Sequence, residues 1–276
     1  MDFIDTHQHL LYRDRLTYSW TAKHKDLSSS DFTLEDYRAL TASRGVAGSL
    51  FMEVDAEEYQ DEARFIATLV GRSGLLGQIA SCRPEVDEGF DAWLEECEDL
   101  HVHGLRRVLH EAPDDLSRSQ TFRKNLRKIG AAGLVFDLVF QARQHPVAMD
   151  LLRVCPDQVF VLDHCGVPDV AGGDFETWSV SLRALAAFPN LSAKLSGIAA
   201  YCAPGTANLE TIKPYVDHVI DCFGPGRIVW GSDWPVVNLR STLPDWLTLS
   251  RQLISDLSPS ERAAIAHDNA KRIYAI

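Results

Sequence analysis

Two histidines separated by one residue stand near the start of the chain, in the segment Asp5-Thr6-His7-Gln8-His9. They come at the end of the short run Phe3–Thr6, which we expect to be a strand. Because side chains alternate along a strand, His7 and His9 share one face and Asp5 lies below them. Two imidazoles on one face can chelate a metal ion or bracket a carbonyl oxygen. The pair alone is weak evidence, since packed or surface histidines are common, and its meaning depends on what else reaches the same place.

A carboxylate and a third histidine end two later apolar runs. Asp233 follows the last run, in Trp230-Gly231-Ser232-Asp233-Trp234-Pro235, where it suits a general base and where Gly231 permits close packing beneath it. His164 follows Val159–Leu162. Successive strand side chains point in opposite directions, so we expect only one of Asp163 and His164 to face the interior. We assign that place to His164 and a structural or supporting role to Asp163.

Further polar side chains end or interrupt the other runs and are candidates for holding a substrate. An arginine inside an apolar strand is costly unless it is paired or used, which favours function for Arg106, whereas Arg107 on the opposite face is expected to be structural. Asp137 interrupts Leu134–Val139 and predicts a buried acid, either in direct contact with a substrate or behind such a residue. The substrate-binding candidates are Glu53, Arg106, His110, Lys194 and Trp234.

The elements that must position these residues are eight short apolar runs with helical patterns between them. Such alternation in one chain predicts a single (β/α)₈ TIM barrel domain over residues 1–276, whose active site lies at the C-terminal ends of the strands. An open doubly wound sheet is the alternative, but it needs a glycine-rich phosphate loop that is absent. Capping boxes are expected at Thr33–Asp36, Asp55–Glu58 and Ser258–Glu261. The expected strands are Phe3–Thr6, Val46–Met52, Leu75–Ala80, Leu105–Leu109, Leu134–Val139, Val159–Leu162, Leu191–Leu195 and Ile228–Trp230.

Composition narrows the class of protein. The 276 residues carry a net charge of −12, which disfavours nucleic acid and anionic membranes as partners. No apolar run could span a bilayer, and no secretory signal is visible. Six cysteines without a CxxC pair fit free thiols in a reducing compartment, so we expect a cytoplasmic protein.

The residues named above resemble the motifs of the amidohydrolase superfamily, in particular Asp5-Thr6-His7-Gln8-His9, His164 and Gly231-Ser232-Asp233-Trp234-Pro235. More narrowly, the chain resembles the branch that contains sugar-acid lactonases and pyrone-dicarboxylate lactonase. That likeness rests on Tyr18-Ser19-Trp20, Gly104-Leu105-Arg106, Leu162–Pro168 and Lys194-Leu195-Ser196-Gly197, and it covers the whole chain in order.

The resemblance implies an enzyme of carbohydrate metabolism that hydrolyses a lactone, with a sugar aldonolactone of the fucono or rhamnono type as the expected substrate. Asp233 would activate water, and His7, His9 and His164 would polarise the carbonyl. A binuclear metal centre is not expected, because strands 4 and 5 offer Arg106, His110 and Asp137 in place of the usual bridging residue and histidine. The expectation is therefore either no required cofactor or one divalent ion, zinc or manganese. Such an ion would be held by His7, His9, His164 and Asp233.

Other functions stay open from the sequence. A metal-dependent, non-oxidative decarboxylase of a related branch would share the His–Asp scaffold, and a non-catalytic barrel that binds sugar acids is a third reading. Within the lactonases, a dicarboxylate substrate of the pyrone or muconolactone type would suit a pocket rich in arginine. The arginines near strand ends are Arg83, Arg106, Arg143 and Arg240. The sequence also leaves open whether the chain forms a homo-oligomer.

Overall fold

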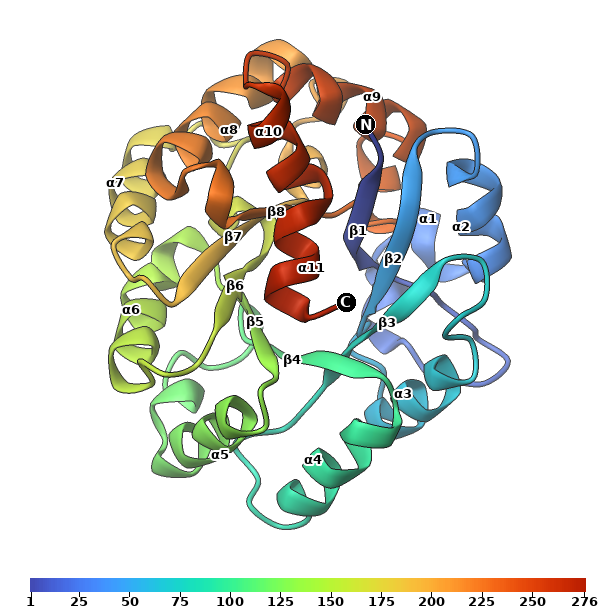
Figure 1. Cartoon of the computed structure of the whole chain (residues 1–276), viewed down its shortest axis with the longest axis vertical. Helices are drawn as coiled ribbons and strands as arrows, with labels where there is room; N and C mark the ends of the chain where they lie inside the picture. Colours follow the sequence, from blue (N-terminus) through green and yellow to red (C-terminus); the bar gives the residue numbers. More distant parts are fainter.

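The computed structural model describes residues 1–276 as an eight-stranded parallel sheet in which the strands follow one another in chain order. Figure 1 shows the strands as an inner ring and the helices around them. The expected (β/α)₈ TIM barrel is therefore confirmed. The strands are β1 (Phe3–Gln8), β2 (Val46–Met52), β3 (Leu75–Ser81), β4 (Val102–Val108), β5 (Val135–Val139), β6 (Phe160–Leu162), β7 (Leu191–Leu195) and β8 (Ile228–Trp230).

The ring closes between β1 and the segment that follows β8. The amide of Asp233 donates to the carbonyl of His7 at 2.8 Å, and the amide of His9 donates to the carbonyl of Trp234 at the same distance. The carboxylate of Asp5 supports this closure, because it accepts from the amides of Ser232 and His7. Barrel closure therefore also brings Asp233 next to the two N-terminal histidines.

Two strand boundaries differ from the expectation by more than one residue. β1 continues to Gln8, so His7 lies within the strand. β4 begins at Val102 rather than Leu105, because Val102 and Gly104 pair with Gln78 and Ile79 of β3. The polar His103 and the small Gly104 break the apolar pattern there without breaking the backbone ladder.

The helices surround the barrel, and none of them is both long and apolar enough to cross a membrane. Capping boxes at Thr33 and Ser258 are confirmed, whereas the one expected at Asp55 is wrong. Asp55 has a left-handed backbone (φ 49°), and α3 begins after Glu58 instead. The helices are α1 (Lys25–Ser28), α2 (Leu34–Thr41), α3 (Tyr59–Ala67), α4 (Phe90–Asp99), α5 (Gln120–Ala131), α6 (His145–Val154), α7 (Phe175–Ala186), α8 (Leu209–Phe223), α9 (Leu243–Leu253), α10 (Pro259–Ala263) and α11 (Asn269–Tyr274).

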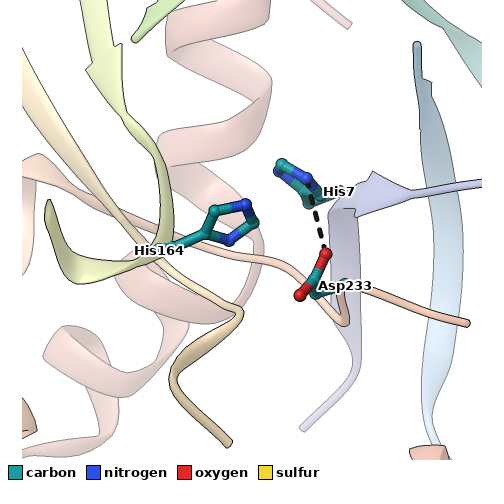
Figure 2. Close-up of side chains that lie close together, drawn as sticks. All are labelled: His7, His164 and Asp233. Carbon is teal, nitrogen blue, oxygen red and sulfur yellow. Dashed lines mark ion pairs between the residues drawn. The ribbon is translucent and has the colours of Figure 1, made fainter. Parts of the chain in front are cut away.

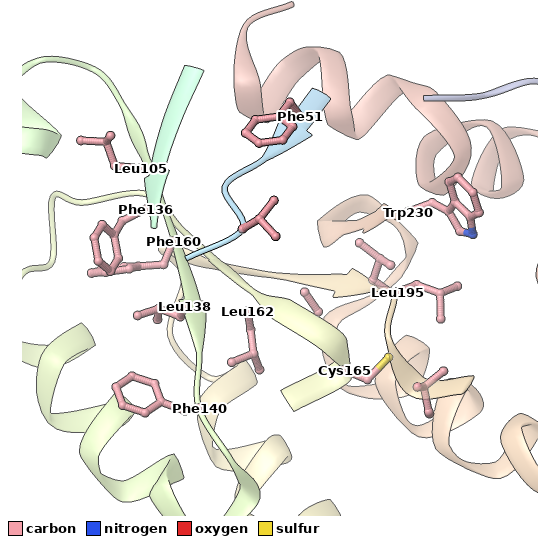
Figure 3. Close-up of a cluster of buried hydrophobic side chains, with 14 of the residues drawn as sticks. Phe51, Leu105, Phe136, Leu138, Phe140, Phe160, Leu162, Cys165, Leu195 and Trp230 are labelled. Carbon is pink, nitrogen blue, oxygen red and sulfur yellow. The ribbon is translucent and has the colours of Figure 1, made fainter. Parts of the chain in front are cut away.

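The apolar side chains form two separate cores. The larger one, part of which is shown in Figure 3, contains Phe51, Phe136 and Trp230. The smaller one contains alternate residues of the same strands, such as Leu50 and Val161, together with Tyr274 of α11. Side chains alternate across a strand, so the larger core lies between sheet and helices and the smaller one fills the barrel interior.

The terminal helix α11 covers one end of the barrel. The ring Nδ1 of His103, near the start of β4, is 2.9 Å from the carbonyl of Tyr274. The side chain of Asn269 donates to the carbonyl of Ile228 at the start of β8. Because α11 blocks the N-terminal ends of the strands, as Figure 1 shows, a ligand can enter only from the C-terminal ends.

Candidate active site

A cavity of about 460 Å³ opens at the C-terminal ends of the strands. Six strands contribute a lining residue that stands just past the strand end. This is the end of a TIM barrel where active sites are built. These residues are His9, Asp55, His110, His164, Tyr201 and Asp233.

Asp233 lies at the floor of this cavity between two imidazoles. Its Oδ1 is 3.4 Å from Nε2 of His9 and 3.7 Å from Nε2 of His7, the contact marked in Figure 2. Nδ1 of His9 is 2.9 Å from the carbonyl of Met52, which can only accept, so Nδ1 carries a proton. In a neutral His9 the other nitrogen would then present a lone pair to a carboxylate.

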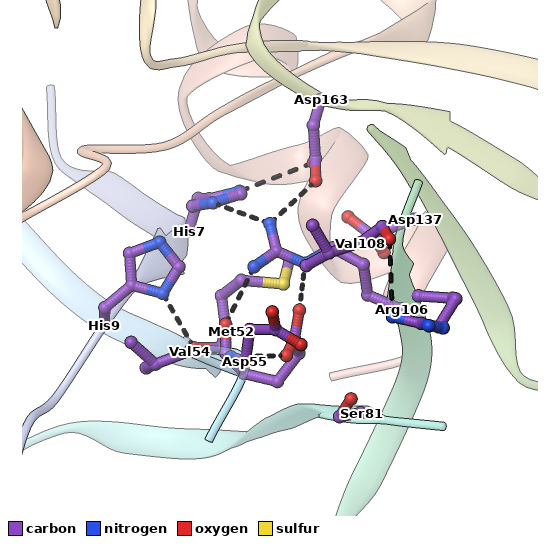
Figure 4. Close-up of polar contacts among 12 residues, drawn as sticks. His7, His9, Met52, Val54, Asp55, Ser81, Arg106, Val108, Asp137 and Asp163 are labelled. Carbon is purple, nitrogen blue, oxygen red and sulfur yellow. Dashed lines mark hydrogen bonds and ion pairs between the residues drawn. The ribbon is translucent and has the colours of Figure 1, made fainter. Parts of the chain in front are cut away.

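His7 is held between two further charged groups. Its Nδ1 is 3.4 Å from Oδ1 of Asp163, and its Nε2 is 3.3 Å from Nη1 of Arg106 (Figure 4). Burial lowers the pKa of His7 well below its usual value, so the ring is neutral near pH 7. A guanidinium only donates, so Nε2 accepts from Arg106 and the proton lies on Nδ1, facing Asp163. Nζ of Lys194 is also 3.3 Å from Nδ1, but its three hydrogens are used by Asp137, Asp163 and the carbonyl of Thr6.

Arg106 is the one expected substrate-binding residue that is both firmly held and open to the cavity. Its Nε donates to Oε1 of Glu53 at 2.5 Å, its Nη2 donates to the Glu53 carbonyl at 2.8 Å, and its Nη1 donates to Oδ2 of Asp163 at 3.2 Å. Although burial raises the pKa of Glu53, Arg106 outweighs it and holds that pKa below its usual value. With the contact to His7, four of the five guanidinium N–H groups are engaged, and one is left for a ligand.

His164 and Asp233 reach the cavity through sharp turns of the backbone. Both have left-handed φ angles, 55° and 57°, which are rare outside glycine and are often found at functional sites. The expectation that only one of Asp163 and His164 faces the interior is wrong. β6 ends at Leu162, so strand alternation no longer applies, and the turn directs both side chains inward.

Two glycines make room for these histidines. A Cβ on Gly231 would lie 2.6 Å from Cβ of His7, as the expected close packing requires. A Cβ on Gly197 would lie 2.3 Å from Nδ1 of His164, and Gly197 also has φ +65°. Any other residue at either position would displace a ring that faces Asp233.

Beneath the cavity floor lies a second group of charged side chains, whose members pair with other groups of the protein. Nζ of Lys194 contacts the carboxylate of Asp137, lies 3.0 Å from Oδ1 of Asp163 and donates to the carbonyl of Thr6 at 3.2 Å. The hydroxyl of Tyr274 donates to Asp137 at 2.9 Å. The side chains of Lys194, Asp137 and Asp163 are fully buried. Asp137 is thus the expected buried acid, and it stands behind the cavity rather than in it.

The structure divides the five expected substrate-binding residues. Arg106 and His110 line the cavity, whereas Glu53, Lys194 and Trp234 do not. Glu53 is buried behind Arg106, and Lys194 is buried below His7. Trp234 packs edge-on against Phe32 with a centroid distance of 5.5 Å. These three residues were expected to contact a substrate directly, and the structure instead places them behind the residues that line the cavity.

The arginines divide in the same way. Arg106 and Arg240 line the cavity. Arg83 pairs with Asp55 at 3.5 Å, and Arg143 pairs with Asp114 at 3.0 Å. Neither Arg83 nor Arg143 lines the cavity.

Several cavity residues were not proposed from the sequence as binding residues. Trp20, Lys23 and His24 come from the segment after β1, and Tyr201 follows β7. Trp20 lies in a motif that carried the family resemblance. Tyr201 stands beyond a glycine and an apolar run, and only its position after a strand end could have marked it.

Two groups of side chains have the composition of a metal site. The first is His7, His164 and Asp233, whose ligand atoms lie within 4.8 Å of one another at the cavity floor (Figure 2). The second is His218, Asp221 and Cys222 on α8. Nε2 of His218 is 2.9 Å from the carbonyl of Ser179, and Arg183 binds Asp221 at 2.6 Å, so internal contacts already occupy that group. The first group, with buried acceptors facing one another, fits a cation better. His9, expected as a fourth ligand, lies beside this group but is not part of it.

A family model described as amidohydrolase matches residues 4–276 of the chain. An L-fucono-1,5-lactonase of Burkholderia ambifaria is 29% identical over 99% of this chain and 95% of its own length. A 2-pyrone-4,6-dicarboxylate hydrolase of Comamonas testosteroni is 27% identical over 67% of this chain and 63% of its own. The crystal structure of an amidohydrolase from Burkholderia multivorans with bound zinc superimposes with a TM-score of 0.91 at 24% identity, covering all of both chains. That likeness establishes the fold.

Proposed function

The chain belongs to the amidohydrolase family, and we propose that it is a hydrolase that opens the ring of a lactone, with a sugar aldonolactone as its substrate. The observation that carries the proposal is the cavity floor, where the Asp233 carboxylate faces imidazoles while a partly free guanidinium lies across from it. Ester hydrolysis needs such a combination of a base for water and donors for the carbonyl oxygen. Relatives named as lactonases support the choice of a cyclic ester.

Asp233 is the base in this proposal. A water beside its carboxylate would give a proton to Oδ1 or Oδ2 as its oxygen attacks the carbonyl carbon. His9 holds Asp233 from one side and is itself fixed by the carbonyl of Met52, so the carboxylate has a defined direction. A held base of this kind contributes typically ~10²–10⁴-fold to a rate.

Arg106 is the donor that we assign to the carbonyl oxygen, and His164 is a second donor only in the metal-free protein, because with an ion bound its cavity-facing nitrogen would hold the ion. The remaining N–H of Arg106 faces the cavity, and its other contacts prevent the guanidinium from turning away. Nδ1 of His164 is 3.0 Å from Oγ of Ser196, which leaves Nε2 for the cavity. His7 is not one of these donors, because its Nε2 accepts from Arg106. The role expected of His7 was to polarise the carbonyl, and in this proposal His7 instead accepts a hydrogen bond from Arg106.

The acceptor character of His7 suits a metal ligand. We propose that His7, His164 and Asp233 hold one divalent ion, zinc or manganese. When bound, such an ion supplies Lewis-acid polarisation of a carbonyl and lowers the pKa of water. Buried, unprotonated nitrogens next to a carboxylate are the donor set that zinc prefers.

The cavity walls bear on the substrate. Asp55 and Glu111 line the cavity, and their carboxylates can accept from sugar hydroxyls. Lys23 and Arg240 also line the cavity, and neither has a carboxylate within 4.0 Å. This pair favours a second candidate, a lactone that carries an additional carboxylate, as in the dicarboxylate alternative.

The experiment is a lactone panel tested on metal-free and metal-loaded protein, with acid release followed by a pH indicator. The panel spans sugar 1,4- and 1,5-lactones, sugar diacid lactones, muconolactone and pyrone dicarboxylate. Fast turnover of a neutral sugar lactone supports the first candidate, and preference for a diacid lactone supports the second. Activity that is lost with a chelator and restored by zinc or manganese supports the metal site.

Silence across the panel would contradict the proposal. The related alternative, a metal-dependent decarboxylase, predicts CO₂ release from a carboxylated aromatic compound with no acid release from any lactone. A binding barrel predicts that a sugar acid raises the Tm while nothing turns over.

A further inference from the structure

Tyr201 lies on the cavity wall next to the proposed reacting groups. It follows β7 in the short helical turn Ile198–Tyr201 and lines the same cavity as Asp233, His164 and Arg106. Its ring meets the ring of His164 edge-on, with centroids 6.1 Å apart. The phenol therefore stands against one of the imidazoles that face Asp233.

The hydroxyl of Tyr201 has no hydrogen-bond partner within the protein, unlike that of Tyr274, which is bound to Asp137. A tyrosine hydroxyl, with an ordinary pKa of about 10, is protonated at neutral pH, so its hydrogen is free for a ligand. A partly buried donor without a partner is costly unless a ligand or water satisfies it.

Ring opening needs such a donor at a defined place. When the C–O bond of the tetrahedral intermediate breaks, the ring oxygen departs with a negative charge, and a sugar alkoxide is a poor leaving group. Arg106 has one N–H left and is assigned to the carbonyl oxygen, and Nδ1 of His9 is bound to Met52. Burial lowers the pKa of His110 to about 4, so that ring is neutral and a weak acid.

The geometry points to Tyr201 as the catalytic residue that donates its phenolic hydrogen to the departing ring oxygen. This inference rests on the proposed lactone hydrolysis and adds the second half of the reaction to it. It also explains why the hydroxyl points into a cavity without a protein partner.

The protons balance over one turnover. Asp233 takes one proton from the attacking water, and the C–OH bond of the new acid forms. As the ring C–O bond breaks, the phenolic hydrogen of Tyr201 passes to the ring oxygen, which becomes the hydroxyl of the product. The proton held by Asp233 then returns to Tyr201, directly or through one water, and the carboxylic acid product ionises into solvent.

The test compares Tyr201→Phe with wild type on two substrates, the best lactone of the panel and the thiolactone of the same acid. A thiolate leaves without a proton, so only the oxygen ester needs the donor. We expect kcat on the lactone to fall ~100-fold, within the range for general acids, with KM changed less than about threefold. On the thiolactone, we expect kcat to fall less than about threefold, because no donor is required.

Each of the other results overturns the inference. Equal losses on both substrates would give Tyr201 a structural role, since a distorted site slows both reactions alike, and because the ratio is taken within one variant, partial unfolding cancels. No loss on either substrate would exclude it. A lactone-selective loss in His110→Gln but not in Tyr201→Phe would transfer the role to His110. If wild type hydrolyses neither substrate, the proposed function itself fails.

The matched control is Tyr12→Phe. Its hydroxyl accepts from the amide of Leu34 at 3.0 Å, outside the cavity, so the same change removes a hydrogen bond without touching the site. Both substrates should keep their wild-type rates within about twofold, since neither donor nor base is altered.

Discussion

The barrel interior holds two groups of charged side chains that are built in different ways. The lower group is Asp137, Asp163 and Lys194, sealed by Tyr274 from α11, and all of its members find partners within the protein. The upper group, around Asp233, faces the cavity, and several of its donors and acceptors lack a protein partner of opposite kind. Both groups are fully or largely buried, so burial of charge by itself does not identify a site.

The contrast indicates that the lower group stabilises the fold, whereas the upper group is available to a ligand. Paired charges at the closed end hold the strands and orient His7 from below, through Asp163. At the open end, two imidazole nitrogens face the Asp233 carboxylate and a phenol faces the cavity. Such unmet groups are retained where a substrate or ion completes them.

The strongest test of the upper group is Asp233→Asn. We expect kcat on the best lactone to fall at least ~10³-fold, because the amide cannot take the proton of water, while the Tm stays within a few degrees. The comparison variant is Glu111→Gln, which neutralises an exposed carboxylate of the same cavity and should change KM rather than kcat, because it would contact the substrate but not the reacting water. If Asp233→Asn retains the wild-type rate, the assignment of the base is wrong.

For the lower group, Lys194→Met should act on stability. Removing Lys194 leaves Asp137 without a cation and Asp163 with Arg106 alone, and we expect a loss of about 3–5 kcal/mol in the free energy of unfolding. Denaturant unfolding measures this loss. The double variant Lys194→Met with Asp137→Asn removes the charge left without a partner and should recover part of the loss. An unchanged unfolding free energy in Lys194→Met would show that the lower group does not hold the barrel.

Measurements of zinc affinity distinguish the candidate site at the cavity floor from the candidate site on α8. Equilibrium dialysis with zinc should give one tight site per chain, and His164→Ala should weaken it by more than the roughly 10- to 100-fold that loss of an outer-shell partner costs, because His164 is a direct ligand. His218→Ala should leave that affinity unchanged, because its ring is already bound to Ser179. The reverse result would move the metal to α8.

The smallest predicted effect is on the pH dependence of the unfolding free energy. It compares a histidine that faces the cavity with one that is enclosed by the protein. Burial lowers the pKa of both His145 and His110 to about 4. Each is neutral when folded and charged when unfolded between about pH 4 and its ordinary pKa of about 6.5. The unfolded state then binds more protons, so the unfolding free energy rises with pH across this window, by at most about 1.4 kcal/mol per unit for each group, and is level above it.

His145 is enclosed by Gly166 and Ser181, whereas the side chain of His110 is 30% exposed to the cavity. His145→Gln should therefore reduce the slope of stability against pH more than His110→Gln does, because water in the cavity partly solvates a charged His110. Unfolding titrations from pH 5 to 7 compare the two variants. A larger change in His110→Gln would mean that the cavity is closed to water.

Much of the fold was predictable because local patterns agree with it. All eight strands were expected from their apolar runs, and their polar end residues gave His7, His9, His164 and Asp233 as one set. At two places the backbone overrides the local residue pattern. The start of β4 is set by its pairing with β3, and the cap expected at Asp55 is absent because Asp55 has a left-handed backbone.

The spacing of these polar residues after apolar runs was enough to predict that they gather at one end of the molecule, because the ends of parallel strands in a barrel meet there. Which of them face the cavity depends on contacts between distant parts of the chain. Lys194 was expected to contact a substrate, but its partners Asp137 and Thr6 lie 57 and 188 residues away in the chain, and they hold it below the floor. Tyr201 came into the site in the same way, through the turn after β7 that sets its ring against His164. Contacts between residues so far apart depend on how the ring of strands closes, and no local spacing records them.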